Sequence, residues 1–130
     1  MKNLAILTAV LAVVLGFAAC EKQNTGTTET VAVTVTSPTE GQMFHNGNSL
    51  NVNVTFTDPT ELHNYSILVV NTTASDTVFN VSGHKHSTSY TVDSTITLNV
   101  SAHSDFELHA NVSNHAGETA HKHVNFHVHP

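Results

Sequence analysis

The last eleven residues of the sequence, Ala120-His121-Lys122-His123-Val124-Asn125-Phe126-His127-Val128-His129-Pro130, decide how the rest of the chain is interpreted. Successive side chains of a β-strand point to opposite faces. We therefore expect the apolar residues to face a core, namely Val124, Phe126 and Val128. The four histidines at odd positions are expected on the other face: His121, His123, His127 and His129. The stretch predicts a strand that carries a row of imidazoles.

The preceding segment alternates in the same way, and the five residues 114–118 have the composition of a hairpin turn. Its apolar positions are predicted to point inward: Phe106, Leu108, Ala110 and Val112. Glu107 and His109 then point outward, on the same surface as the histidine row. In an antiparallel hairpin this allows registers in which His109 lies opposite His123 or His127.

Further alternating segments cover residues 31–36, 50–56, 62–71, 77–81 and 90–100, the last of them interrupted by Asp93-Ser94. Turn residues separate them, including the connection 39–48 and the turn Gly83-His84-Lys85-His86. No segment has the 3.6-residue apolar period of a helix. The pattern predicts an all-β protein, with one immunoglobulin-like antiparallel β-sandwich of about seven strands over residues 31–130.

The first 19 residues have the features of a secretory signal peptide: Lys2, then an apolar run from Leu4 to Phe17, then small residues. The small residues end on Cys20, the only cysteine of the chain. This site resembles the lipobox of bacterial lipoproteins, although Phe17 stands where that motif usually has an aliphatic residue. The resemblance implies that Cys20 carries lipid. Residues 20–30 are polar and are predicted to be a flexible tether.

Two patterns resemble known families. The series Ser37-Pro38, Gly41, Gly47, the alternating run 50–56, Asp58 and the run 62–69 is similar to Ig-like modules of bacterial surface proteins. The whole chain, with its central Gly-His-Lys-His turn and His-rich final strands, resembles small His-rich lipoproteins of Bacteroidetes that carry an Ig-like domain of unknown function. The resemblance implies a cell-envelope location, anchored to the outer membrane on the periplasmic or the surface side. It implies no particular activity.

The charge balance argues against nucleic-acid binding. The sequence has four Lys and Arg residues, ten acidic residues and a formal net charge of −6 with His neutral. Phosphate recognition needs clustered basic side chains, which are missing here. The eleven histidines make the surface charge depend steeply on pH, because unperturbed His titrates near ~6.5. The expected membrane contact is therefore the lipid on Cys20.

The histidine row indicates metal binding, because neutral imidazole is the commonest metal ligand in proteins. Imidazoles suit Zn, Cu or Ni, and the sequence does not choose among these ions. The third strand of an Ig-like sandwich borders the sixth, which brings His63 toward the same sheet. The candidate ligands are His63, His84, His86, His109, His121, His123, His127, His129 and Glu107.

The sequence favours a non-catalytic, extracytoplasmic protein that binds a divalent transition metal for capture, storage or delivery. It lacks the nucleophile elbow, phosphate loop and HExxH helix of common enzyme classes. A zinc hydrolase that uses Glu107 as a base is the enzymatic alternative. The other alternative is a structural or adhesion-type surface module with a solvated, pH-responsive His-rich face. A protein partner at the cell surface fits either reading.

Overall fold

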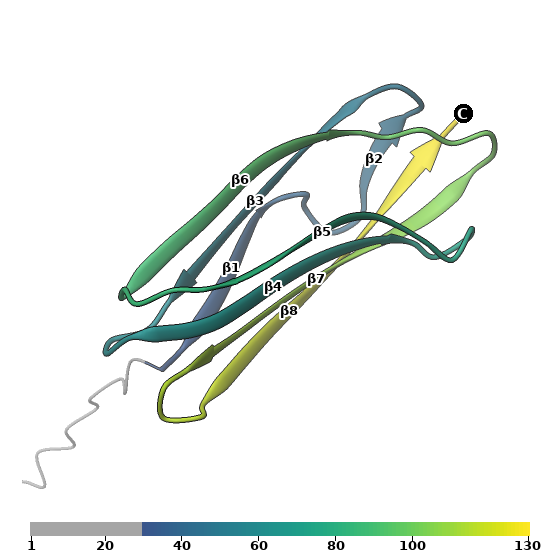
Figure 1. Cartoon of the computed structure of the whole chain (residues 1–130). Helices are drawn as coiled ribbons and strands as arrows, with labels where there is room; N and C mark the ends of the chain where they lie inside the picture. Colours follow the sequence, from purple (N-terminus) through teal and green to yellow (C-terminus); the bar gives the residue numbers. More distant parts are fainter. Residues whose placement is uncertain (1–29) are drawn as a thin grey trace, which may run out of the picture.

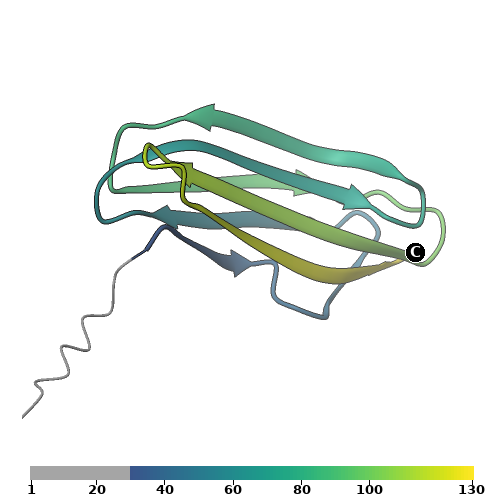
Figure 2. The same ribbon diagram turned by 90° about the horizontal axis from the view of Figure 1, so that it is seen from below.

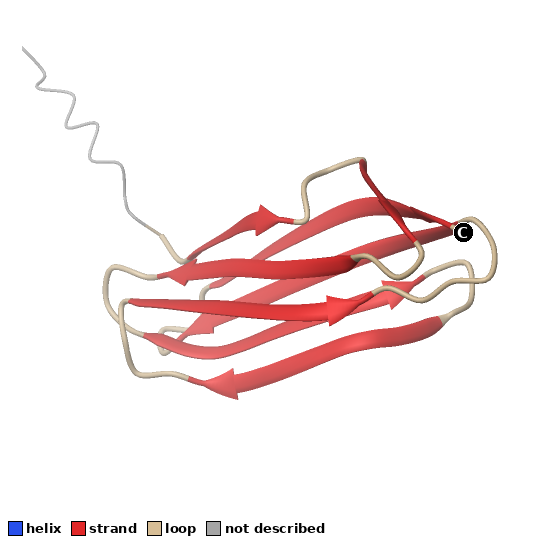
Figure 3. Ribbon diagram, turned by 90° about the horizontal axis from the view of Figure 1, so that it is seen from above, coloured by secondary structure: helices blue, strands red, loops and turns tan. Residues whose placement is uncertain are grey.

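The computed structural model describes residues 30–130, which form eight strands and no helix (Figures 1 and 3). The strands are β1 (Ala32–Ser37), β2 (Gln42–His45), β3 (Ser49–Thr57), β4 (Leu62–Asn71), β5 (Asp76–His84), β6 (Ser89–Thr97), β7 (Ser104–Asn114) and β8 (Thr119–His129). They build a three-stranded sheet, β1-β3-β6, and a five-stranded sheet, β2-β8-β7-β4-β5. The two sheets pack into the predicted Ig-like β-sandwich.

The described chain enters at one end of the sandwich, and its C-terminus lies at the other end (Figures 1 and 2). The β3–β4, β5–β6 and β7–β8 connections all lie at the end where the chain enters (Figure 1). Within residues 30–130, we find no helix with the length and apolar character needed to cross a bilayer. The predicted signal peptide, Cys20 and most of the tether fall outside the described residues.

Alternating side chains from both sheets fill the core as predicted. Phe56 comes from the smaller sheet and Phe106 and Phe126 come from the larger one, and all three are at most 1% exposed. Phe126 stacks on Phe106 with ring centroids 5.2 Å apart and meets Phe44 edge-on at 5.6 Å. Val124 and Val128 are buried beside Phe126. The prediction that this face of the last strand points inward is confirmed, which places its histidines outside.

The strand prediction was wrong for the connection 39–48, because this segment contains β2. β2 pairs in parallel with β8, with Phe44 beside Val128 in the register, so the sandwich is not purely antiparallel. Gly41 and Gly47 bracket β2 and have φ angles of 71° and 80°, a region that glycine adopts without strain. The backbone N–H of Gly41 also donates to the carbonyl of Asn125 at 2.8 Å.

Two further boundaries differ from the sequence prediction. Asp93-Ser94 does not interrupt its strand, because β6 is continuous and the Asp93 carboxylate accepts hydrogen bonds from Asn51 and Asn53 on neighbouring β3. Gly83 and His84 are not in a turn but end β5, where they pair with β4. The second change matters for the site, because it fixes His84 on a sheet.

Candidate metal centre

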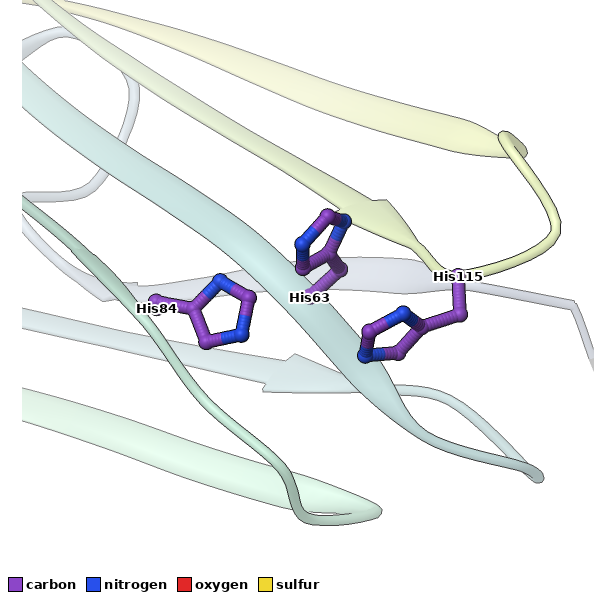
Figure 4. Close-up of side chains that lie close together, drawn as sticks. All are labelled: His63, His84 and His115. Atoms are coloured by element: carbon purple, nitrogen blue, oxygen red, sulfur yellow. The ribbon is translucent and has the colours of Figure 1, made fainter.

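Five side chains meet at the end of the sandwich where the described chain begins, and we call them the loop cluster: Glu61, His63, His84, His86 and His115. Glu61 precedes β4 and His63 follows its first residue, His84 ends β5, and His115 lies in the β7–β8 turn. Figure 4 shows the rings of His63, His84 and His115 lying close together, although they come from these separate elements. One ligand atom from each of these three lies within 4.8 Å of the others, and the same holds for Glu61, His86 and His115.

A buried pair, Asp58 and Asn114, joins the loop that carries Glu61 to the β7–β8 turn. Asp58 is 2% exposed and Asn114 is 3% exposed. The backbone N–H groups of Thr60 and Glu61 each donate to Asp58 Oδ1 at 2.7 Å, and Asn114 Nδ2 donates to Asp58 Oδ2 at 2.9 Å. Asn114 Oδ1 accepts from the backbone N–H of Glu118 at 2.9 Å. These bonds fix the two loops relative to each other.

The charge of Asp58 is stabilised by these donors. Burial by itself raises the pKa of a carboxyl group, but the hydrogen bonds from Thr60, Asn114 and the Glu61 backbone outweigh it and lower the pKa of Asp58 to about 2. The site therefore has a permanent buried anion in its supporting layer at neutral pH. Such outer groups orient the ligands of metal sites and favour a positive charge nearby.

Gly83 allows β5 to pass close to Tyr65. A Cβ at Gly83 would lie 2.8 Å from the Tyr65 hydroxyl, which is too close for any side chain. Lys85, one residue beyond His84, lies on the other side of the strand, with its ammonium nitrogen 4.3 Å from the ring centre of Tyr90. Because side chains alternate, His84 and His86 lie on the side opposite Lys85 and face the other residues of the cluster.

A chain of hydrogen bonds sets the protonation of these two histidines. Asn64 Oδ1 can only accept, so its contact of 3.2 Å with Nδ1 of His84 requires the proton of that ring on Nδ1. Nε2 of His84 is then an acceptor, and its contact of 2.7 Å with Nε2 of His86 requires His86 to donate. A neutral His86 is left with a lone pair on Nδ1.

Nδ1 of His86 faces two other candidate ligand atoms. His86 Nδ1 lies against Oε1 of Glu61 and 3.2 Å from Nε2 of His115, and the same His115 atom lies 3.3 Å from Oε1 of Glu61. A proton on His86 Nδ1, a proton on His115 Nε2 or a metal ion can lie among these three atoms. With the proton on His86, the hydrogen bond from His86 lowers the pKa of Glu61 below its usual range.

His63 packs against the other rings of the cluster. Its ring stacks on His115 with centroids 4.2 Å apart and meets His84 edge-on at 4.3 Å. Desolvation, together with repulsion from the neighbouring imidazoles of His115, His84 and His86, lowers the pKa of His63 below its ordinary value of 6.5. His63 is therefore kept in its neutral form, which is the form that binds metals.

A second group, Glu107, His109 and His123, lies on the outer face of the five-stranded sheet, and we call it the strand cluster. The register pairs His109 with His123, one of the two arrangements that the sequence allows. Glu107 Oε2 lies 3.1 Å from Nε2 of His109, and Oε1 lies 3.3 Å from Nδ1 of His123. Nδ1 of His109 lies 3.3 Å from Nε2 of His123. One ligand atom from each of these three residues lies within 4.8 Å of the others.

The remaining candidate histidines lie on the same sheet but outside both clusters. The His121 ring centroid lies 5.6 Å from that of His123, and His127 contacts Asp105 with Nδ1 2.6 Å from Oδ1. His129 packs against His103 with ring centroids 4.3 Å apart. The structure therefore divides the predicted histidine surface into separate groups and does not gather it into one.

Sequence reasoning missed Glu61 and His115 as candidate ligands. His115 was assigned to the hairpin turn. The direction of a side chain in a turn follows from how the surrounding loops fold, and the local sequence pattern does not give it. Glu61 is two residues from His63, so the pattern Glu-Leu-His at the start of a strand was the available signal. Both residues need the Asp58–Asn114 contact to come together, and that contact joins positions 56 residues apart.

Comparison with solved structures shows likeness in fold at low sequence identity. Fibronectin(III)-like modules of CbhA from Clostridium thermocellum match with a TM-score of 0.47 and 17% identity, covering 75% of this chain and 94% of the module. CopC from Methylosinus trichosporium OB3b matches with a TM-score of 0.44 and 16% identity, covering 76% of this chain and 95% of CopC. Spo0M, a sporulation control protein of Bacillus subtilis, matches with a TM-score of 0.47 and 10% identity, covering 78% of this chain and 49% of Spo0M.

No family model matches the sequence, and no curated protein is similar to it. Imidazole and carboxylate groups, with one ligand atom each within 4.8 Å of the others, are compatible with binding a metal ion.

Proposed function

We propose that this protein binds a divalent transition metal, without catalysis, at the loop cluster. The observation that carries the proposal is the meeting of His86 Nδ1, Glu61 Oε1 and His115 Nε2, three candidate ligand atoms that lie within 4.8 Å of one another. Two ligands bound to one zinc ion at tetrahedral angles lie about 3.3 Å apart, given Zn–N distances of about 2.0–2.1 Å. The two contacts of His115 have this spacing, whereas Glu61 and His86 lie closer together and would move apart to bind one ion.

Imidazole ligands favour Zn, Cu or Ni over the hard cations Mg and Ca. Among the divalent ions, intrinsic affinity peaks at Cu, so the supply of metal in the compartment decides which ion is bound. The side chains of Glu61, His86 and His115 are 44%, 60% and 45% exposed. An ion held at so open a position exchanges easily with solution, which suits capture, storage or delivery better than chemistry on an enclosed substrate.

We further propose that the protein is lipid-anchored at Cys20 in the cell envelope. The lipobox-like site in the sequence supports this location. Thr30 lies ten residue steps from Cys20, a segment that spans at most about 33–36 Å when extended. Because the described chain begins at the end that carries the loop cluster, the anchor would join the domain at the end with the metal site (Figure 1).

The anchor is tested by Cys20→Ser. Without the acceptor thiol, the protein is expected to leave the membrane fraction or to keep its signal peptide uncleaved. Fractionation and mass measurement of the mature protein follow the outcome. A variant that is processed and partitions like the wild type contradicts the lipoprotein assignment.

The metal site is tested by calorimetric titration of wild type and His115→Ala with Zn, Cu and Ni. His115 belongs to both ligand triads of the loop cluster, so its loss is expected to weaken binding at this cluster by about a hundredfold or more, at least as much as the loss of an outer-shell partner. His103→Ala is the matched control, since His103 is an exposed histidine outside both clusters. Weak, graded binding in the wild type that falls equally in both variants would favour the solvated surface module.

A further inference from the structure

The strand cluster lies too far from the loop cluster to share its ion. On β4, Leu68 pairs with His109, whereas Asn64 pairs with His84 of the loop cluster. The four residue steps from Asn64 to Leu68 correspond to about 13 Å along a strand at about 3.3 Å per residue. Metal–ligand bonds are only about 2.0–2.3 Å long. Any ion at the strand cluster is therefore separate from the one at the loop cluster.

The β7–β8 ladder holds the strand cluster in place. His109 and His123 are directly opposed in the register, and Glu107 lies one position along the same face of β7. Beneath them, β7 and β8 bury Phe106, Leu108 and Phe126 completely or almost completely, so the backbone that carries the ligands is held by the core. Rigid elements of this kind preorganise ligands better than loops do.

The residues around Glu107 do not compete with the imidazoles of His109 and His123 for its carboxylate. The residue opposite Glu107 on β8 is Asn125, and Asn125 is engaged by Glu40 through both its backbone N–H and its side-chain amide. On the other side, β4 places Val70 beside Glu107 and Leu68 beside His109. Both side chains are half-buried. The carboxylate is only 27% exposed and borders an apolar wall, which strengthens its attraction for a cation.

We propose that Glu107, His109 and His123 form a second metal site, so that one chain binds two divalent transition-metal ions. Two imidazoles and one carboxylate are a recurring ligand set for such ions. Three protein ligands on the surface of a sheet leave the remaining coordination positions open toward solvent. Metal binding at this site does not depend on whether the loop cluster binds a metal ion.

The test is the stoichiometry of Zn binding to the full chain, measured by calorimetry in a Cys20→Ser background so that no thiol contributes. The starting chain is expected to bind two ions. His115→Ala retains the strand site and binds one ion tightly, and His109→Ala/His123→Ala retains the loop site and also binds one. The chain with all three changes is expected to have no saturable tight site.

Two variants made on His115→Ala show which residues hold the second ion. Glu107→Gln keeps the size and removes the charge of the carboxylate, and it is expected to weaken the remaining site by about tenfold or more. His121→Ala/His127→Ala removes two exposed imidazoles from the same face of β8, outside the cluster, and is expected to leave affinity within about twofold, in contrast to the tenfold scale of ligand-shell changes.

Absence of a saturable site in His115→Ala overturns the second site. An equal loss in the two histidine double variants also overturns it, because that result means diffuse surface binding. The proposal for the loop cluster is tested separately, in His109→Ala/His123→Ala. A tight site there supports the loop cluster even when the strand cluster fails, and the reverse result supports the strand cluster alone.

Discussion

The loop cluster and the strand cluster use the same ligand types but are built in different ways. The loop cluster collects residues from positions 61 to 115, from loops and strand ends, and depends on the buried contact between Asp58 and Asn114. The strand cluster takes three residues from two adjacent strands, and the register alone brings them together. Strand periodicity therefore specifies the second arrangement, whereas the first requires tertiary contacts that no local pattern encodes.

The largest expected effect tests the scaffold under the strand cluster. Phe126→Ala removes a fully buried ring between Phe106 and Phe44 and is expected to lower the free energy of unfolding by about 3–5 kcal/mol. His127→Ala, one residue away on the outer face, removes an exposed pair with Asp105 and is expected to cost at most about 1 kcal/mol. Urea denaturation of metal-free protein measures both. Equal destabilisation would mean that the two faces of β8 have been exchanged.

Metal binding is expected to stabilise the folded protein by an intermediate amount. At a free metal concentration of a hundredfold over the Kd, one site adds about 2.7 kcal/mol. Protonated imidazole cannot bind a metal, so this gain is expected to fade as the pH falls from about 7.5 through about 6.5 toward 5. Melting temperatures with and without metal measure the effect.

The two clusters are separated in this experiment by using His109→Ala/His123→Ala for the loop site and His115→Ala for the strand site. Each variant is expected to retain part of the metal-dependent stabilisation. A rise in melting temperature that persists unchanged at pH 5 would contradict imidazole ligation at either cluster.

The prediction with the smallest expected effect tests whether Asp58 supports the loop cluster and not the strand cluster. The pKa of Asp58 is lowered from 3.8 to about 2 in the folded protein, so its charge contributes about 2 kcal/mol of stability above pH 4. The unfolded chain takes up this proton first, and the contribution is lost as the pH falls from about 4 toward 2. Asp58→Asn presents an amide to the amide of Asn114 and is expected to lose about this stability at pH 7.

Wild type and Asp58→Asn should therefore converge in stability toward pH 2, as followed by denaturation at a series of pH values. Zn affinity of the variant should fall at the loop cluster and stay unchanged at the strand cluster. An unchanged loop site in a destabilised variant would show that Asp58 supports the fold without positioning Glu61.

Alternation predicted most of the fold correctly. It placed Phe126 and its neighbours on β8 in the core, and it allowed two registers of β7 with β8, of which the structure has the one that puts His109 opposite His123. It failed where pairing between strands distant in sequence decides. The end of β5 at Gly83 and His84 depends on pairing with β4, and β2 depends on β8, so neither appears in the local sequence.

The candidate site was predictable to the same extent. The histidines of β7 and β8 were assigned to the correct face, because period-two patterns fix the face of each side chain, but His84 was assigned to a turn although it ends β5. His115 could not be assigned, because its position follows from the turn and from the buried contact of Asn114 with Asp58. A candidate carboxylate ligand such as Glu61 is likewise found only when the loops are placed, since acidic residues are common on exposed loops.

The parallel pairing of β2 with β8 gives the domain a particular response to mechanical force. β1 begins at the end where the described chain enters, β2 follows it, and β8 leads to the C-terminus at the opposite end (Figure 1). Pulling the two ends apart loads β1 along β3 and β2 along β8, so the hydrogen bonds between β2 and β8 are loaded together and do not open one at a time. The bonds from Gly41 to Asn125 and from Asn46 to His129 extend this contact beyond the strand. A domain tethered at its N-terminal end and pulled through its last strand would therefore unfold by shear, at a rate set by the barrier to breaking this whole contact.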